Sequence, residues 1–359
     1  MLLQIDRPQP LRPDLLFDVL PLENYLREQV PGFETLYSIE QFAGGFSNLT
    51  FCLHTNLGDW VLRRAPVGAA IQSAHDMERE HRVLTLLLPH YAAVPKPLLY
   101  CDHLEVMGAP FYLMERVEGI VLRGKDAKQL AQGDPVLLRR LCEGFVDNLA
   151  ALHKIDIEAT ELIQLGKPDG YVLRQTEGWI GRFHRAHTDD CPDATSIEQW
   201  LRTHQPPPNP PTLLHNDYKF DNLVFAWPLE PEPHLLTVLD WEMTTVGDPL
   251  MDLGAALGYW VEPGDDPFFK AFNFTWLPGC LTRQELADRY ARLTGRDLSA
   301  LPFYYAFGLY KNAVILQQIY ARWKAGIASD PRFEALGHGV RVLLQMAERT
   351  VKERANNNL

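Results

Sequence analysis

Between residues 35 and 112 the chain alternates short apolar runs with polar turns. The runs are rich in β-branched and aromatic residues and are separated by Gly or Asn, which is typical of antiparallel strands. One stretch breaks this pattern, because its apolar positions recur at helical spacing and its charges fall on the opposite face. This part of the chain therefore predicts a small, mainly antiparallel sheet that carries one helix. The expected strands are 37–42, 49–55, 60–64 and 110–115, the expected helix is 74–88, and 91–97 is expected to be a Pro-bounded connector.

Beyond Gly119 the apolar positions follow a helical period. The run 205–211 contains five prolines and predicts a stiff, exposed connector. Asp248-Pro249 is a good helix start, since Asp caps the first turn and Pro fits its first position. The expected helices are 136–154, 170–187, 286–293, 301–324 and 332–354.

These patterns predict an α+β fold with two lobes, and 359 residues are enough to give each lobe a sizeable core. The first lobe is expected to span 1–115, of which 1–34 are a surface arm and a short helix at 22–30. The second and mostly helical lobe is expected to span 116–359.

The composition is that of an ordinary globular protein, and the net charge argues against some classes of binding partner. Lys and Arg number 34 against 46 Asp and Glu, which gives a net charge of −12. That balance argues against nucleic acid and anionic membrane as partners, because both need a basic surface. No apolar run approaches the ~18–20 residues that span a bilayer, and the five cysteines are scattered and odd in number. We expect a cytoplasmic protein with reduced thiols.

The densest chemistry lies in the octet 215–222, His-Asn-Asp-Tyr-Lys-Phe-Asp-Asn, with Asp240 following after an apolar run. Phosphoryl transfer needs these residue types: Asp217 can take the proton of an attacking hydroxyl, and Lys219 can neutralise charge on the migrating group. Asn222 and Asp240 can hold Mg²⁺ on the phosphates of a nucleotide. The flanking runs predict strands at 212–214, 222–225 and 235–239, which would bring the two metal ligands onto neighbouring strands.

Two other interpretations of the octet, a structural loop and a metallohydrolase site, are less well supported by the sequence. A lone His-x-Asp is common in loops, where Asp and Asn satisfy turn backbone. His215 is expected to brace the loop and not to react. A metallohydrolase would need further ligands at suitable spacing, and only Asp248 and Asp252 lie near, the first as a helix cap. Asp252 could tie its helix to the catalytic loop.

The octet and Asp240 resemble the aminoglycoside phosphotransferase and choline kinase superfamily, which shares the protein-kinase-like fold. Within it, the chain looks most like the branch that contains the kinase-like domain fused to acyl-CoA dehydrogenases in animals, together with free-standing bacterial relatives. The likeness covers nearly the whole chain, from about residue 20 to the last helix. It implies a two-lobed kinase-like fold, ATP and Mg²⁺ as cofactors, and a link to an acyl-CoA dehydrogenase pathway. The stretches that carry the branch resemblance are 42–50, 60–65, 94–100, 111–119 and 213–254.

The resemblance also assigns a nucleotide site in the first lobe. Arg63 stands where the family has a Lys that binds the α- and β-phosphates, and a guanidinium keeps the charge with a different geometry. Glu80 is the expected acidic partner of Arg63, with Glu78 as the alternative. Paired glycines in the loop after residue 42 would let backbone N–H groups approach phosphate, although a plain hairpin turn has the same composition. The loop residues expected to bind nucleotide are Gly44, Gly45, Phe46, Ser47 and Asn48.

The strand at 111–115 would lead into the hinge between the lobes. The resemblance implies that backbone groups of Glu115 and Val117 pair with adenine and that Met114 borders the purine. Simple core packing is the ordinary alternative for a Met in an apolar strand.

The predicted function is transfer of the γ-phosphoryl group of ATP to a hydroxyl of a small molecule. Trp241-Glu242 follows Asp240 where protein kinases carry Phe-Gly, which favours a small acceptor over a protein. The acceptor pocket is expected among the aromatic-rich helices after Gly254, and the branch resemblance favours a hydroxy acid or its thioester. Because acids occur there too (Glu262, Asp265, Asp266), an amine remains an alternative. A nucleotide-binding pseudokinase that serves a partner enzyme is the alternative for the whole chain, since Arg63 departs from the family pattern.

Overall fold

The computed structural model describes residues 8–12, 15, 17–42, 48–65, 76–131, 134–229, 232–328 and 330–357. The chain forms two compact units. Unit 1 comprises residues 1–121 and 222–244, and unit 2 comprises 122–221 and 245–359. The sequence predicted a nucleotide-binding lobe at 1–115 and a catalytic and substrate-binding lobe at 116–359. This division by function stays a prediction.

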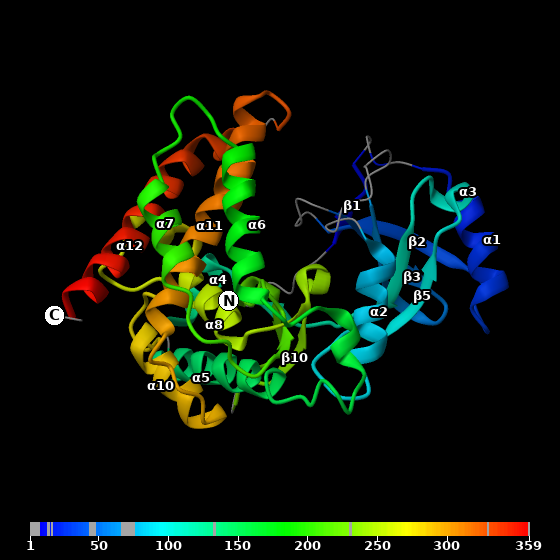
Figure 1. The fold of residues 1–359 in the computed structure, drawn as a ribbon. Helices are drawn as coiled ribbons and strands as arrows, with labels where there is room; N and C mark the ends of the chain where they lie inside the picture. The colour runs from blue at the N-terminus through cyan, green and yellow to red at the C-terminus, as the bar shows by residue number, and fades with distance from the viewer. Residues whose placement is uncertain are drawn as a thin grey trace. The chain divides into compact units, whose positions relative to one another are not determined.

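Unit 1 is built on a six-stranded antiparallel sheet in the order β1-β2-β3-β4-β6-β5 (Figure 1). Alternate side chains of its central strands pack with α1 in one apolar core that includes Phe51, Leu62 and Leu113. Side chains at the intervening positions point to the other face, where α2 lies against β5 and β6. The elements are β1 (Gln9–Pro10), α1 (Leu20–Gln29), β2 (Leu36–Gln41), β3 (Leu49–Thr55), β4 (Gly58–Arg64), α2 (Met77–Leu87), β5 (Pro97–Cys101), α3 (Leu104–Met107) and β6 (Phe111–Glu115).

A second sheet in unit 1 joins segments that are far apart in sequence. Strand β9 (Leu223–Phe225) pairs antiparallel with β10 (Leu235–Val238) on one side and with β7 (Ile120–Val121) on the other. A 3₁₀ turn, η5 (Trp241–Met243), follows β10. The polypeptide therefore enters unit 1 within the predicted catalytic octet, between Asp221 and Asn222.

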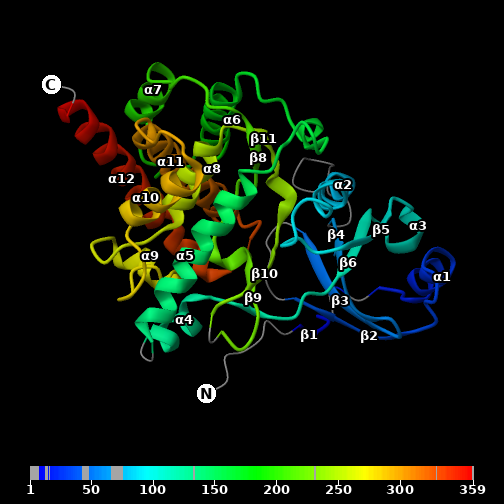
Figure 2. The same cartoon turned by 90° about the horizontal axis from the view of Figure 1, so that it is seen from below.

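Unit 2 is mostly helical, and α8, α11 and α12 pack together within it (Figure 2). Helices α8 and α11 cross in backbone contact at two glycines. A Cβ added to Gly254 would lie 2.1 Å from the Tyr304 carbonyl oxygen, and one added to Gly308 would lie 2.1 Å from the Gly254 carbonyl oxygen. Only glycine allows this approach, which fixes α11 against the helix that follows the catalytic strands.

The remaining elements of unit 2 surround this helix pair. The short strands β8 (Thr212–Leu214) and β11 (Thr245–Gly247) pair antiparallel ahead of α8. The others are α4 (Gly124–Ala131), α5 (Pro135–Leu152), η3 (Leu162–Leu165), α6 (Tyr171–Arg185), α7 (Thr195–Thr203), η4 (Phe220–Asn222), α8 (Pro249–Tyr259), α9 (Pro267–Phe272), α10 (Arg283–Thr294), α11 (Leu301–Lys324), η6 (Pro331–Ala335) and α12 (Leu336–Asn357). No helix in the described ranges is both long and apolar enough to cross a membrane.

Most expected elements are present, and the departures have local causes. Residues 97–101 form β5, beyond the connector predicted for 91–97. This strand lies at the sheet edge, where a Pro at the first position needs no N–H partner. The helix predicted to start at 332 begins at Leu336, because Asp330 and Pro331 open a 3₁₀ turn instead. The short helices α3, α4, α7 and α9 were not predicted from the sequence.

A charged network crosses strands β2, β3 and β4 and makes unit 1 sensitive to pH. His54 Nδ1 lies 2.7 Å from Asp59 Oδ1, and its Nε2 lies 3.0 Å from Glu40 Oε2. Arg116 Nη1 lies 2.7 Å from Asp59 Oδ2 and 3.7 Å from Cys52 Sγ. Burial opposes protonation of His54, but the two carboxylates outweigh it and raise the His54 pKa above 6.5.

We expect His54→Gln to destabilise the protein in acid and not in base. A raised folded-state pKa gives stability that is present below the unfolded pKa and is lost as the pH rises through the folded value. The loss should be about 1 kcal/mol, or about 2–4 °C in Tm at about pH 5.5, and should vanish at about pH 9. His90→Gln, at an exposed histidine of the same unit, is the control. An equal Tm loss at both pH values would contradict the assignment.

Candidate active site

The predicted catalytic loop, which begins at His215, is held by one buried carboxylate of unit 2. Asp252, on α8, accepts the N–H of His215 at 2.7 Å and that of Asn216 at 2.9 Å. His153 Nε2 lies 3.3 Å from the same carboxylate, and His153 Nδ1 lies 2.7 Å from the Tyr290 hydroxyl. Burial opposes ionisation of Asp252, but hydrogen bonding and the charge of His153 keep its pKa below the ordinary value. A carboxylate that accepts two backbone N–H groups fixes where the loop begins.

His215 and Asn216 then set the direction of the next residue. The Asp217 N–H donates to His215 Nδ1 at 3.2 Å, which fits the bracing role predicted for His215. Asn216 has a φ of 65°, a left-handed conformation that Asn tolerates better than most residues. The Tyr171 hydroxyl donates to Asn216 Oδ1 at 3.2 Å, and Lys311 Nζ donates to the Asn216 carbonyl oxygen. These contacts from α6 and α11 stabilise the strained residue.

Lys311 is a functional candidate that sequence analysis missed. It is 2% exposed, and burial lowers its pKa to about 8 although Asp217 and Asp252 oppose the shift. It lies in an aromatic helix with no motif around it, so only the packing of α11 on α8 reveals it.

Asp217 is held as an ionised carboxylate at the end of this loop. Lys219 Nζ lies 2.9 Å from Asp217 Oδ2, and the Tyr259 hydroxyl donates to Asp217 Oδ1 at 2.9 Å. Burial alone would raise the pKa of Asp217, but the Lys219 charge and its hydrogen bond hold it below the ordinary value. The ammonium also lies 5.0 Å from the centre of the Tyr259 ring, a cation–π distance. A hydroxyl brought to this carboxylate would meet a proton acceptor beside a fixed positive charge.

A cavity opens next to these residues within unit 2. It encloses about 400 Å³ of space, including the part open to solvent. Half of its lining residues are aromatic, and Lys219 and Asp221 are its charged members. Its lining is Leu122, Phe145, Lys219, Phe220, Asp221, Ala256, Tyr259, Trp260, Phe272, Asn273, Phe274 and Thr275.

Several aromatic side chains of the helices after Gly254, where the acceptor pocket is expected, are core residues. Phe303, Tyr304 and Tyr310 on α11 are fully buried and do not line the cavity. The Tyr304 hydroxyl donates to Asp248 at 2.8 Å, and Asp248 also caps α8 through the Leu250 N–H at 2.9 Å. With Asp248 and Asp252 both engaged by protein groups, the described residues of unit 2 offer no ligand set for the metallohydrolase. In the described ranges, the one group of three side chains of metal-ligand type is Cys52, His54 and Asp59, where Arg116 pairs with the acid.

The two predicted metal ligands lie side by side in unit 1. The Leu239 N–H donates to the Asn222 carbonyl oxygen at 2.8 Å, so the residue before Asp240 is bonded to Asn222 directly. Asp240 has a φ of 68°, which ends β10 and begins η5 at this carboxylate. Both side chains offer the oxygen atoms that Mg²⁺ prefers.

Arg63 joins the sheet to this pair. Its Nη1 lies 3.2 Å from Glu80 Oε1, and its Nη2 lies 3.0 Å from Asp240 Oδ1 and 3.6 Å from Glu242 Oε2. Glu80 is buried while Glu78 is exposed, so Glu80 is the acid that pairs with Arg63. Burial raises the pKa of Glu80, and Arg63 opposes that shift. Three carboxylates around one guanidinium leave excess negative charge, and a divalent cation fits that imbalance.

Arg79, to which the sequence assigned no role, and Asn48, which was predicted to bind nucleotide, hold the segment after Asp240. Arg79 Nη1 donates to the Glu242 carbonyl oxygen at 3.0 Å, and Nη2 donates to that of Thr244. Asn48 Nδ2 donates to Glu242 Oε2 at 3.1 Å, so Asn48 contacts the acidic group beside Arg63. The signal for Arg79 was its place in the helix that carries Glu80, but nothing local distinguished it from a surface charge.

The other predicted nucleotide residues are only partly visible. Gly44, Gly45, Phe46 and Ser47 lie outside the described residues. Met114 is 6% exposed within β6 and faces Val61 of β4 in the sheet register. The Glu115 N–H donates to the Lys96 carbonyl oxygen at 2.9 Å, so an adenine contact at Glu115 would use its carbonyl group. Val117 follows in the connection between β6 and β7.

The chain combines a sheet that carries an Arg–Glu pair with an Asp-x-Lys loop, and an Asn and an Asp follow that loop. These features are typical of one class of protein, the phosphotransferases of protein-kinase-like fold. The profile of one such family, the phosphotransferase enzyme family, matches residues 38–290, and the chain belongs to that family.

Two similar proteins are animal acyl-CoA dehydrogenase family members. The human acyl-CoA dehydrogenase family member 11 is 32% identical over 350 residues, and mouse family member 10 is 31% identical over 352 residues. These matches cover 94% and 96% of this chain but 44% and 32% of the relatives, so the chain spans less than half of their length.

Solved structures agree on the fold. A Ralstonia eutropha protein, provisionally described as an aminoglycoside phosphotransferase, has a TM-score of 0.78 at 32% identity, with 94% of this chain and 99% of that chain covered. Choline kinase of Cryptosporidium parvum has a TM-score of 0.64 at 12% identity, with coverages of 95% and 97%. At that identity the second likeness concerns the fold alone.

We expect Asp252→Asn to reduce activity at least about tenfold while the protein stays folded. The amide keeps the volume but loses the charge that holds two backbone N–H groups and His153. Stability should fall by about 2–3 kcal/mol, because hydrogen bonds to charged groups are worth about that much. Turnover and urea unfolding measure the two effects. Asp288→Asn, at an exposed acid on α10, is the matched control, and unchanged turnover in Asp252→Asn would refute the bracing role.

Proposed function

We propose that the protein transfers the γ-phosphoryl group of ATP to the hydroxyl of a small acceptor, preferably a hydroxy acid or a hydroxyacyl thioester. The observation that carries the proposal is the Asp217 carboxylate, ionised between Lys219 and Tyr259 beside an aromatic cavity. In the proposed reaction Asp217 takes the hydroxyl proton as the oxygen attacks the γ-phosphorus. Lys219 steadies the developing charge, and ADP leaves with the electrons of the broken bond.

Unit 1 supplies the proposed nucleotide and metal ligands. Asn222 and Asp240 would hold Mg²⁺, which supplies charge neutralisation on the phosphates when bound. Arg63, fixed by Glu80, would contact the phosphates, and the loop 44–48 would cover them. Asp217 and Asn222 are five residues apart, so the chain keeps their Cα atoms within about 18 Å of each other.

The acceptor preference rests on the charges of unit 2. A polycationic antibiotic needs free carboxylates, yet Glu262 lies 3.1 Å from Arg283 and Asp265 also pairs with Arg283. Asp266 caps α9 through the Phe268 N–H at 2.8 Å. The acids that kept an amine acceptor open are thus engaged, and the aromatic cavity suits an aliphatic chain that bears a hydroxyl. The names of the acyl-CoA dehydrogenase relatives point to the same acceptor chemistry.

A nucleotide-binding pseudokinase is the second candidate. Arg63 is already engaged by Glu80 and Asp240, and its planar fork differs from the lysine ammonium that the family places there. This candidate retains ATP binding and lacks acceptor-stimulated turnover.

The deciding assay is Mg²⁺-dependent ADP release from ATP with a panel of acceptors. The panel contains hydroxy acids, hydroxyacyl-CoA thioesters, choline, sugars and aminoglycosides. We expect stimulation by hydroxy acids or their thioesters, and loss of about 10²–10⁴-fold in Asp217→Ala, because a general base contributes about that much.

Asp193→Ala, at an exposed acid of unit 2, controls for nonspecific loss of a charge. ATP binding without stimulation by any acceptor would support the pseudokinase instead. Stimulation by aminoglycosides alone would overturn the acceptor preference.

A further inference from the structure

One face of α6 carries three arginines whose side chains lie over glycines of the preceding turn. Arg174, Arg182 and Arg185 each lie four residues after a glycine, and three- and four-residue spacings fall on one helix face. A Cβ added to Gly181 would lie 3.1 Å from Arg185 Nη1, and one added to Gly178 would lie 3.8 Å from Arg182 Nη1. The guanidinium groups of Arg182 and Arg185 thus lie back along the helix surface instead of extending away.

Within the described part of the chain, Arg182 and Arg185 have no acidic partner. Among the residues that the structure describes, none of the ion pairs includes Arg182 or Arg185, although the chain as a whole carries a charge of −12. Burial lowers the pKa of Arg182, and the neighbouring charge of Arg185 lowers it further. Two like charges left together in an acidic protein favour an anion from outside.

The nearby acids are engaged by other groups. Glu177, on the same helix, binds Arg202 through both oxygens at 2.8 and 2.9 Å. Glu198 lies 2.9 Å from His184 Nε2 and accepts the Tyr310 hydroxyl at 2.9 Å. Asp190 lies 2.8 Å from Lys324 Nζ. The acids around α6 therefore leave the basic face uncompensated.

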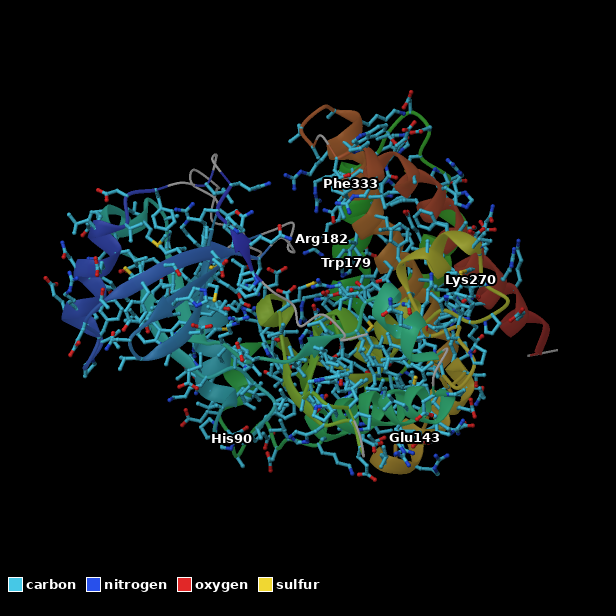
Figure 3. All side chains as sticks on the ribbon, turned by 180° about the vertical axis from the view of Figure 1, so that it is seen from behind. His90, Glu143, Trp179, Arg182, Lys270 and Phe333 are labelled. Carbon is cyan, nitrogen blue, oxygen red and sulfur yellow. The ribbon has the colours of Figure 1, made fainter. Side chains whose placement is uncertain are left out.

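This face begins close to the catalytic loop. The Arg182 guanidinium carbon lies 4.5 Å from the centre of the Trp179 ring, and Lys311 Nζ lies 5.5 Å from the same centre; Figure 3 labels Trp179 and Arg182 together on α6. Lys311 in turn donates to Asn216, the residue before Asp217. Contiguous contacts within unit 2 thus connect Asp217 to the arginine face, with a side-chain layer between them.

We propose that the α6 face of Arg182 and Arg185 binds the phosphate groups of a coenzyme A thioester whose acyl hydroxyl is presented to Asp217. Arg174, on the same face, already donates to the carbonyl oxygens of Lys167 and Asp169. The inference rests on the proposed function and narrows its acceptor to the thioester. Guanidinium groups bind phosphate through paired hydrogen bonds. In coenzyme A the phosphates lie at the far end of the pantetheine arm from the acyl group, so their site must lie apart from the reacting hydroxyl. A free hydroxy acid carries no phosphate group for this face.

The test compares full-length wild type with the double variant Arg182→Gln/Arg185→Gln. Calorimetric titration with free coenzyme A should show binding that weakens about tenfold or more in the variant, the equivalent of one to two charge-assisted bonds. KM for a hydroxyacyl-CoA should rise by a similar factor, whereas KM for the matched free hydroxy acid and for ATP should change less than about twofold. Arg182→Lys/Arg185→Lys should recover part of the affinity, because the charges remain.

Arg292→Gln/Arg349→Gln is the matched control, at exposed arginines of α10 and α12. Equal coenzyme A affinity in wild type and the α6 variant, or no coenzyme A binding by wild type, overturns the inference. A change in KM for ATP alone assigns the face to the nucleotide and also overturns it. If no acceptor is phosphorylated, the proposed function fails, while the titration with coenzyme A still decides this binding site.

Discussion

The two backbone hydrogen bonds from His215 and Asn216 to the buried carboxylate of Asp252 are the constraint on which the catalytic loop depends. A buried charge is costly unless it is paired and hydrogen-bonded, and here His153 and the loop amides compensate it. The same bonds hold Asn216 in its left-handed conformation, and Lys311 adds a donor from α11. Asp217 is thereby presented to Lys219 and Tyr259 without freedom to turn away. The close crossing of α8 and α11 at Gly254 and Gly308 keeps these supports together.

In unit 1, the guanidinium of Arg63 pairs with two carboxylates at once. Arg63 uses one nitrogen for Glu80 and the other for Asp240, so its planar fork ties helix α2 to the end of β10. A lysine ammonium would be a single point charge between the two acids. The replacement thus preserves the link between helix, sheet and metal ligand. Glu242 adds a further carboxylate where protein kinases carry a glycine, and Asn48 and Arg79 hold that segment by hydrogen bonds.

Sequence predicted what is local and missed what is brought together by packing. Asp217, Lys219 and Asn222 lie within one loop between two strands, so their order alone placed them. Glu78 and Glu80 could not be separated from the sequence, because both are acids in the first turn of α2. Only the direction of Glu80 toward β4 distinguishes them.

Lys311, Tyr259 and Arg79 reach the sites from helices whose sequences carry no motif. The aromatic residues of α11 show that composition alone does not distinguish a pocket wall from a core. Phe303 and Tyr310 have the composition of a pocket wall, and packing against α6, α7 and α8 makes them core. The fold class followed from periodicity, since strands and helices leave distinct spacings.

In the proposed mechanism, metal binding and acceptor activation are divided between Asp240 and Asp217. Calorimetric titration of ATP, with and without Mg²⁺, into Asp217→Asn and Asp240→Asn tests this division directly. Asp217→Asn should bind ATP with the Mg²⁺ dependence of the wild type. Asp240→Asn should bind ATP with an affinity that Mg²⁺ no longer increases. Undiminished Mg²⁺ dependence in Asp240→Asn, or its loss in Asp217→Asn, would contradict the account.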